Sequence, residues 1–174
     1  MIRTATPILI AAALAGCQTT ANQPSAPLGR AVLYFADGRP AGTAQLLAEG
    51  DSVAVAVELS SLPAGIHAVH LHTTGKCEAP GFTSAGGHLN PAMHQHGKDN
   101  PMGAHLGDMP NVEAGADGGA SFKTVLTGAK DTVLGQIYDA DGTAIVVHEK
   151  ADDYRTDPTG NAGSRIACGV FEAH

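Results

Sequence analysis

Three histidines lie within six positions of one segment, "GIHAVHLH", at residues 65–72. The segment otherwise has the composition of a β-strand, where histidine is an uncommon filler. Residues two apart in a strand share a face, so His70 and His72 point one way and His67 points the other. Two imidazoles about 7 Å apart at Cα can bind one metal ion. His70 and His72 are therefore either metal ligands or exposed strand residues, and His67 is expected to support the nearby loop backbone.

A second group of histidines lies in residues 73–110, a glycine-rich segment without a strand pattern. Its candidate ligands are His88, His94, His96, His105 and Asp108. Three neutral imidazoles and one carboxylate make a closed, four-coordinate zinc site. His105 and Asp108, three residues apart, can approach one ion from a single turn. His94 and His96 compete for the same position in such a site, so both alternatives stay open at this point.

His148 ends the otherwise mostly apolar segment "TAIVVH" at residues 143–148, and we expect it to emerge at the mouth of a barrel. One closed zinc site uses three histidines. His70, His72 and His148 are then left over, and they suffice for a second metal ion. The spacing therefore indicates two metal sites.

The segments that must position these residues have the pattern of β-strands. The chain has 174 residues with 22 glycines, and it is 43% hydrophobic but only 4% aromatic, which suits short strands joined by tight turns in one domain. Period-two alternation or apolar content predicts strands at 29–35, 41–49, 52–59, 65–72, 120–126, 143–148 and 165–171. No segment shows a convincing helical period. We therefore expect an all-β fold, an antiparallel sandwich or flattened barrel.

Two stretches depart from the strand pattern, residues 73–110 and residues 149–164. The first is rich in glycine and histidine, and the second is polar with Pro158 and several glycines. Long irregular loops in a compact domain are usually functional. The expected architecture is one β-domain carrying two long functional loops, with no second domain and no internal repeat.

The first residues have the layout of an export signal. "MIRTATPILIAAALAGC" has an early positive charge at Arg3, then an apolar run too short to span a bilayer, and it ends in "LAGC". This ending resembles the bacterial lipoprotein signal, in which the cysteine becomes the lipidated first residue. We expect a lipoprotein signal peptide at 1–16, lipid on Cys17, a disordered tether at 17–28 and the folded domain at 29–174. The alternative is an ordinary secretory signal.

These expectations place the mature chain in the periplasm, held by lipid on a membrane of the cell envelope. If Cys17 carries the lipid, Cys77 and Cys168 remain as a pair, and an oxidising compartment favours a disulfide between them over two buried free thiols. The formal net charge of −7 leaves no basic stripe that could neutralise phosphates. A nucleic-acid partner is therefore excluded.

Several segments together resemble the copper/zinc superoxide dismutase family over residues 30–171. They are "GIHAVHLH", "SAGGHLNP", "HGKDNPMGAHLGDMPNV", "VVHEKADD" and "GNAGSRIACGV", which appear along the chain in the family's order. The resemblance implies an eight-stranded Greek-key β-barrel. It also implies an oxidoreductase with copper and zinc as cofactors.

The resemblance further implies a residue for each part of the site. Copper would be held by His70, His72, His88 and His148. Zinc would be held by His88, His96, His105 and Asp108, with His88 bridging the two ions. Asp152 would link a copper ligand to a zinc ligand, Arg165 would guide the substrate anion, and Cys77 would pair with Cys168.

The implied activity converts superoxide to dioxygen and hydrogen peroxide through a Cu(II)/Cu(I) cycle, with His88 relaying a proton. Such an enzyme would act as an antioxidant and protect the cell envelope. Lys98 and Lys150 either assist Arg165 in attracting the anion or are ordinary solvated lysines. A monomer and a homodimer both stay open. His94 has no place in the family pattern and is either an exposed loop residue or an auxiliary ligand that captures metal.

Two other classes of function compete with this reading. A copper-capturing or metal-storage lipoprotein could share the fold, but it would not need an anion-guiding arginine such as Arg165. A structural or adhesion domain could also use a β-sandwich, since fold does not dictate function. Such a domain could lose ligands freely, yet every ligand position is filled here.

Overall fold

The computed structural model describes residues 27–174. The expected signal peptide, Cys17 and most of the expected tether lie outside the described residues. The first strand begins at Pro27 and pairs there with Leu47, so Pro27 and Leu28 belong to the sheet rather than to a tether. Within residues 27–174, no helix is long and apolar enough to cross a membrane.

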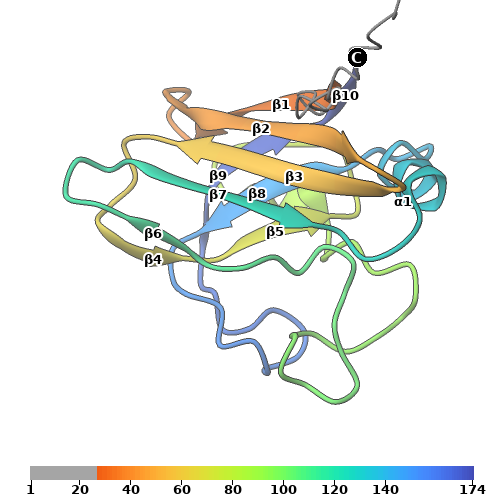
Figure 1. The fold of residues 1–174 in the computed structure, drawn as a ribbon. Coiled ribbons are helices and arrows are strands. Elements are labelled where there is room, and N and C mark those ends of the chain that lie inside the picture. Colours follow the sequence, from red (N-terminus) through yellow and green to blue (C-terminus); the bar gives the residue numbers. More distant parts are fainter. Residues whose placement is uncertain (1–26) are drawn as a thin grey trace, which may run out of the picture.

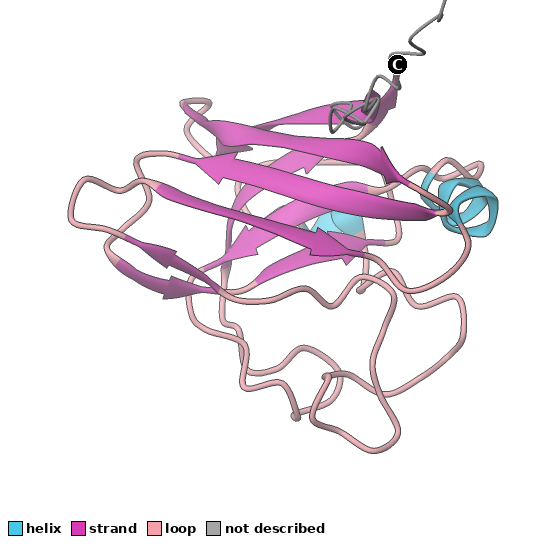
Figure 2. Cartoon of the chain, viewed as in Figure 1, coloured by secondary structure: helices cyan, strands magenta, loops and turns pink. Residues whose placement is uncertain are grey.

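The described chain is built almost wholly of strands and loops (Figure 1, Figure 2). The strands are β1 (Pro27–Phe35), β2 (Pro40–Glu49), β3 (Ser52–Leu59), β4 (Gly65–His67), β5 (Val69–His72), β6 (Val112–Ala114), β7 (Ala120–Val125), β8 (Ala144–His148), β9 (Arg165–Val170) and β10 (Glu172–Ala173). One α-helix, α1 (Lys130–Ile137), precedes β8, and a short 3-10 helix occupies Thr83–Ala85.

Seven strands follow one another across a single antiparallel sheet in the order β5-β8-β9-β1-β2-β3-β7, and β10 adds to β1. β4 and β6 form a separate two-stranded sheet. Because the sheet curls over its own buried face, the fold is a flattened Greek-key barrel of the all-β class, as the strand pattern predicts (Figure 1).

The barrel interior is filled by small aliphatic side chains. β3 shows the reason: Val53, Val55 and Val57 alternate along the strand and are at most 1% exposed. Burying each such side chain contributes about 1.5–3 kcal/mol relative to leaving it exposed. The core is therefore a rigid support on which the loops can be arranged.

Two features differ from the expectation. The segment 65–72 is not one strand, because Ala68 interrupts it: the amide of Ala68 donates to Lys150 O, β4 pairs with β6, and β5 pairs with β8. The helix α1 is also unexpected, since it has only eight residues, an internal Gly135 and no side-chain cap. Its helical character comes from packing Val133 and Ile137 onto the barrel rather than from local preference.

The two long loops lie together on one side of the sheet (Figure 2). Several contacts join them: the amide of Asp99 donates to Tyr154 O, the amide of Asn111 donates to the Tyr154 hydroxyl at 2.7 Å, and Lys98 Nζ lies 4.3 Å from the centre of the Tyr154 ring. The loops thus form one cover over the adjacent strands.

Candidate metal centre

The histidines of β5 project away from the barrel interior. In this strand Val69 and Leu71 belong to the main hydrophobic core, and His70 and His72 alternate with them. All four side chains are buried, because the long loops cover the outward face. His148, at the end of β8, is also buried at 3% exposure rather than open at a barrel mouth.

Buried ring nitrogens without a hydrogen-bond partner gather at this covered face. Besides His96 Nδ1, which lies 3.0 Å from Asp108 Oδ1, five buried side-chain polar atoms among the described residues lack a partner: His70 Nδ1, His72 Nε2, His88 Nε2, His148 Nε2 and Thr143 Oγ1. Four of these five are imidazole nitrogens. A buried polar group without a partner is costly, so this group of nitrogens indicates a missing common partner.

Four of the free nitrogens form a first cluster. One ligand atom from each of His70, His72, His88 and His148 lies within 4.8 Å of the others. The opposite nitrogen of His72 donates to Gly86 O at 3.0 Å, and that of His148 faces Gly163 O at 3.4 Å. A carbonyl oxygen can only accept, so in both rings Nδ1 carries the proton and Nε2 presents a lone pair to the cluster.

A second cluster surrounds one oxygen of Asp108. Its Oδ1 lies 3.0 Å from Nδ1 of His88, 3.0 Å from Nδ1 of His96 and 3.2 Å from Nδ1 of His105. The other oxygen accepts the amides of Gly97 and His105. Three imidazole nitrogens and one carboxylate oxygen therefore converge, as a closed zinc site requires.

His70 also lies within 4.8 Å of His88, His96 and Asp108, so distance alone would admit it to the second cluster in place of His105. The ring orientations separate the two. His70 Nε2 faces Asp152 Oδ2 at 2.8 Å, whereas His105 Nδ1 lies 3.4 Å from His88 Nδ1 and close to Asp108 Oδ1. The geometry therefore favours His105 in the second cluster.

His88 belongs to both clusters. Its Nδ1 faces Asp108, and its Nε2 is one of the free nitrogens of the first cluster. The ring centres of His88 and His70 are 4.0 Å apart. A single imidazole thus presents one nitrogen to each side.

Asp152 hydrogen-bonds to one histidine of each cluster. Its Oδ2 accepts from His70 Nε2 at 2.8 Å, and its Oδ1 accepts from His96 Nε2 at 2.9 Å. Each ring is thereby held with its other nitrogen, Nδ1, turned inward. Gly160, at φ +63°, permits this approach, since a Cβ there would overlap Asp152 Oδ1.

Burial and neighbouring charges set the ionisation of the metal-free site. Burial lowers the pKa of His88 to about 4, of His148 to about 3 and of His72 to about 2. In His96 burial acts in the same direction, but hydrogen bonds to Asp108 and Asp152 outweigh it and raise the pKa to about 9. His72, His88 and His148 are therefore neutral at pH 7, as metal-ligating imidazole must be.

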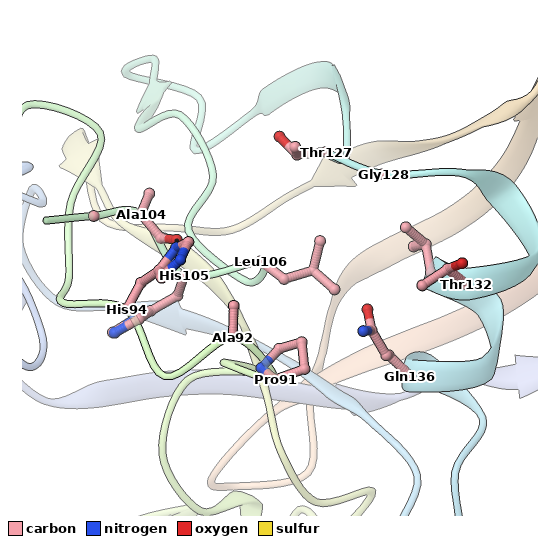
Figure 3. Close-up of a pocket in the computed structure, with 12 residues that line it drawn as sticks. Pro91, Ala92, His94, Ala104, His105, Leu106, Thr127, Gly128, Thr132 and Gln136 are labelled. Carbon is pink, nitrogen blue, oxygen red and sulfur yellow. Dashed lines mark hydrogen bonds between the residues drawn. The ribbon is translucent and has the colours of Figure 1, made fainter.

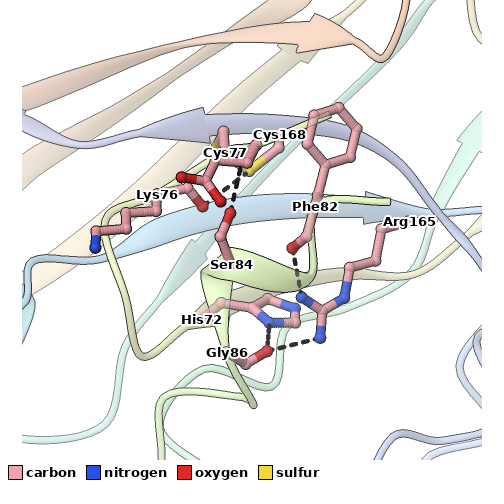
Figure 4. The surroundings of a disulfide bond; sticks show 9 residues. His72, Lys76, Cys77, Phe82, Ser84, Gly86, Arg165 and Cys168 are labelled. Carbon is pink, nitrogen blue, oxygen red and sulfur yellow. Dashed lines mark hydrogen bonds between the residues drawn. A yellow bond between two sulfur atoms is a disulfide. The ribbon is translucent and has the colours of Figure 1, made fainter. Parts of the chain in front are cut away.

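Arg165 and the disulfide lie beside the first cluster (Figure 4). The guanidinium donates to Phe82 O at 2.7 Å and to Gly86 O at 2.6 Å. Gly86 O also accepts from His72, so one carbonyl oxygen positions both the Arg165 guanidinium and the His72 ring. The Cys77–Cys168 disulfide, with the two Cα atoms 5.7 Å apart, ties this loop to β9 and confirms the expected pairing.

His67 and His94 lie outside both clusters. His67 faces His148 O and Pro63 O, each at 2.8 Å, so it supports backbone as its strand position suggested. His94 is exposed and its Nδ1 pairs with Ala104 O at 3.1 Å. His96, and not His94, therefore occupies the position for which the two histidines competed.

Asn111 is a site residue that our sequence reasoning missed. Its side-chain amide donates to Asp152 O at 2.9 Å and its side-chain oxygen accepts from the Asp152 amide at 2.8 Å. The carboxylate of Asp157 likewise accepts the amide of His96 at 2.6 Å. These partners are 41 and 61 residues apart in the chain. No local sequence pattern predicts these hydrogen bonds. The one available signal was that Asn111 comes directly after residues 73–110.

Comparisons with known proteins agree with this geometry. A family model described as "Copper/zinc superoxide dismutase (SODC)" matches residues 40–171. "Superoxide dismutase [Cu-Zn] 1" of Aquifex aeolicus (strain VF5) is 42% identical over 142 residues, which cover 78% of this chain and 82% of that protein. "Superoxide dismutase [Cu-Zn]" of Caulobacter vibrioides is 41% identical over 148 residues, covering 82% and 84%.

A solved structure shows the same likeness. The crystal structure of a SOD-like protein from Bacillus subtilis superposes with a TM-score of 0.76 and 38% sequence identity. The match covers 83% of this chain and 99% of that chain. The similarity thus extends over nearly the whole described domain.

Proposed function

This chain belongs to the copper/zinc superoxide dismutase family, an oxidoreductase family that uses copper and zinc, and on that premise we propose how its residues share the dismutation of superoxide. The overall reaction combines two superoxide anions and two protons into dioxygen and hydrogen peroxide. The proposal assigns ligands to each metal, a proton carrier and an anion guide.

The four free nitrogens of the first cluster are the proposed copper ligands: His70 Nδ1, His72 Nε2, His88 Nε2 and His148 Nε2. The fit rests on their chemistry and on their lack of other partners. Four neutral imidazoles suit copper in both of its common oxidation states. The single observation that carries the proposal is this set of buried, converging nitrogens.

The second cluster supplies the proposed zinc ligands, which are His88, His96, His105 and Asp108. A carboxylate with three imidazoles forms a closed site, as in structural zinc centres. Asp152 then fixes the orientation of one ligand on each side, since it holds both His70 and His96. When bound, copper supplies the one-electron chemistry that no side chain here performs readily, and zinc supplies a fixed positive charge.

His88 is the proposed proton carrier. Its Nδ1 stays on the Asp108 side, so its Nε2 is the atom that can take up a proton and give it to the oxygen that becomes peroxide. The second proton comes from solvent. Burial of the ring keeps this exchange away from bulk water.

Arg165 is the proposed guide for the anion. It lines an open pocket of about 450 Å³ with Pro80, Gly81, Thr83, Gly163 and Ser164. Its two backbone acceptors hold the guanidinium in place, so a permanent positive charge stands at the approach to the first cluster. A charge in a cleft can attract an anion even though the whole chain is acidic.

The site of action is also a proposal. The "LAGC" ending at Cys17 supports lipid attachment and a place on a membrane facing the periplasm, where the enzyme would protect the cell envelope. The Cys77–Cys168 disulfide supports an oxidising compartment.

Metal content measured beside activity tests the assignment. Asp108→Ala removes the oxygen on which the second cluster converges, so it should lose zinc while copper stays on His70, His72 and His148. His70→Ala should lose superoxide-dependent activity and copper affinity while zinc remains. Elemental analysis of the purified variants, with a superoxide assay, reads both outcomes.

Equal loss of both metals in both variants would contradict two separate sites. Full copper and zinc occupancy without superoxide-dependent activity in the unaltered protein would favour metal storage over catalysis. Arg39→Ala is a suitable control, because Arg39 pairs with the exposed Asp37 and lies over Phe35, away from both clusters.

A further inference from the structure

Two adjoining pockets lie beside the zinc-side cluster. The larger, of about 420 Å³, lies between loop residues 91–106 and α1 (Figure 3). The smaller, of about 220 Å³, shares Pro91 and Gln136 with it as lining residues. The two therefore form one depression, which we name the loop–helix depression. None of the residues that line the pocket at Arg165 lines it.

His105 connects this depression to the proposed zinc ligands. It lines the larger pocket, and its side chain is 5% exposed, against 0% for His96 and 1% for His88. Its Nδ1 is turned to Asp108, so another part of the ring faces the pocket. His105 is thus the ligand that an ion arriving from this side would meet first.

His94 lines the same pocket as His105. Its Nδ1 donates to Ala104 O at 3.1 Å, because a carbonyl oxygen only accepts, so Nε2 is the ring nitrogen that remains to bind an ion. Asn90 holds the His94 backbone at both ends, accepting its amide at 3.0 Å and donating to its carbonyl at 2.8 Å. Figure 3 places His94 on the same wall as His105, across from Thr132 and Gln136 of α1.

The charge of the depression suits a cation. Asp139 and Asp141 line the smaller pocket, and among residues 27–174 no lysine or arginine lines either pocket. Thr132 and Gln136 add neutral oxygen atoms. The depression thus offers carboxylate oxygens, which accept a hydrated divalent ion, and imidazoles, which zinc prefers.

We propose that the loop–helix depression is a loading site for a divalent cation of the zinc type. Asp139 and Asp141 attract the hydrated ion, His94 Nε2 binds it transiently, and it passes to His105. One imidazole with carboxylate and water binds more weakly than the closed site, so the ion moves inward. This inference rests on the proposed zinc site and adds a route and a residue, His94, to it.

Rates of metal exchange test the proposal without reference to activity. The full chain is stripped of metal with its disulfide intact, and Co²⁺ serves as a coloured substitute for Zn²⁺. Stopped-flow absorbance gives the rate of uptake, and transfer to a chelator gives the rate of release. Because a transit residue affects both directions alike, His94→Ala should slow uptake and release by the same factor, about threefold or more, with an unchanged Kd.

The carboxylates have a matched control. Asp139→Asn with Asp141→Asn keeps the side-chain shapes, and should slow uptake at low ionic strength with the difference shrinking in high salt. Asp117→Asn is the control. Asp117 is an aspartate that accepts a backbone amide in a turn, but it lies between β6 and β7 and does not line the depression. Its uptake rate should equal that of the unaltered chain.

Three results would overturn the loading site: unchanged rates in His94→Ala, a Kd that weakens with release accelerated, or equal slowing by Asp117→Asn. A failure of the zinc assignment itself looks different. In that case the unaltered chain would take up no Co²⁺ that depends on His105, as shown by His105→Ala.

Discussion

Arg165 combines an electrostatic task with a structural one. Its charge stands beside the pocket at the first cluster, and its two donors hold Phe82 O and Gly86 O. Gly86 O also orients His72. Burial lowers the pKa of Arg165, but guanidinium stays charged at any physiological pH. Substitutions can separate the two tasks.

Arg165→Ala should lower the superoxide-dependent rate by roughly 10-fold or more at low ionic strength, since one well-placed charge in a cleft can change association by that order. The loss should be smaller in high salt, where attraction in the unaltered enzyme is itself screened. Arg165→Glu should be slower still, because it reverses the local field. Pulse radiolysis at several ionic strengths measures these rates.

Arg165→Lys is the matched control, because it keeps the charge and loses the fork that spans two carbonyls. It should retain more activity than Arg165→Ala and keep a similar salt dependence. Unchanged rates in the Ala and Glu variants at low salt, with copper and zinc verified, would remove Arg165 from the active site.

At the scale of elements, the two long loops form one unit through Asn111. The Asn111 amide makes two hydrogen bonds to the backbone of Asp152, and Asp152 in turn holds one ring of each cluster. The loops are therefore positioned by contacts between them as well as by the strands below. A change at Asn111 should reach the metals without touching them.

Asn111→Ala should weaken zinc binding by about 10–100-fold, the range typical for partners of metal ligands. It should also lower stability by about 1–3 kcal/mol, because buried backbone groups of Asp152 lose their partner. Competition with a zinc chelator and urea unfolding measure the two effects.

Asn100→Ala is the control for that experiment, since Asn100 is half-buried and also donates between the loops, but to Arg155 O at 3.4 Å and not to Asp152. Its zinc affinity should stay close to that of the unaltered chain. Equal weakening in both variants would show that general loop contact, and not the hold on Asp152, governs the site.

At the scale of the whole molecule, the site makes the metal-free chain sensitive to pH. The pKa values of His72, His88 and His148 lie below the ordinary value of 6.5, chiefly because of burial, and that of His96 lies above it. Below pH 6.5 all four histidines take up a proton in the unfolded chain, whereas His72, His88 and His148 stay unprotonated in the folded chain down to their lower pKa values. The free energy of unfolding therefore falls as the pH falls. Between pH 6.5 and about 9 only His96 differs, and its contribution is lost as pH rises.

The metal-free chain should therefore show its highest free energy of unfolding near pH 6.5, as measured by urea titrations from pH 4.5 to 9. His72→Gln should reduce the slope below pH 6.5 by up to about 1.4 kcal/mol per pH unit, which is the value of one proton. A variant slope equal to that of the unaltered chain would contradict the assignment of buried, neutral His72.

We propose that lipid on Cys17 sets the position of the whole molecule in the cell. Nine residues lie between Cys17 and Pro27, so ten steps of at most about 3.6 Å would keep the domain within about 36 Å of the membrane surface. In Figure 1, β1 lies on the side of the molecule opposite the two long loops, so those loops would face away from the anchor. Cys17→Ser should release soluble protein with its metals and rate intact, as fractionation and assay of both forms would show. An unaltered protein that is unlipidated and freely soluble would contradict this.

The all-β class, most strand positions and the two long loops were predictable from the sequence. Period-two alternation such as that of β3 is a local consequence of one buried face, so it is visible residue by residue. α1 was not predictable, because Gly135 and the absent cap weaken its local preference and only packing of Val133 and Ile137 stabilises it. The break at Ala68 likewise depends on its pairing with Lys150, 82 residues away in the chain.

For the site, the sequence by itself determined the supply of ligands: histidines two apart on β5 and a loop rich in histidine with one well-spaced aspartate. The family resemblance then assigned each to a metal. Only the tertiary structure decided which nitrogen of each ring stays free, because that follows from partners such as Gly86 and Asp152 that lie far away in sequence. The tertiary structure also decided that Asn111 hydrogen-bonds to Asp152 and that His94 lines a pocket. Contacts between segments that are distant in sequence cannot be predicted from local spacing.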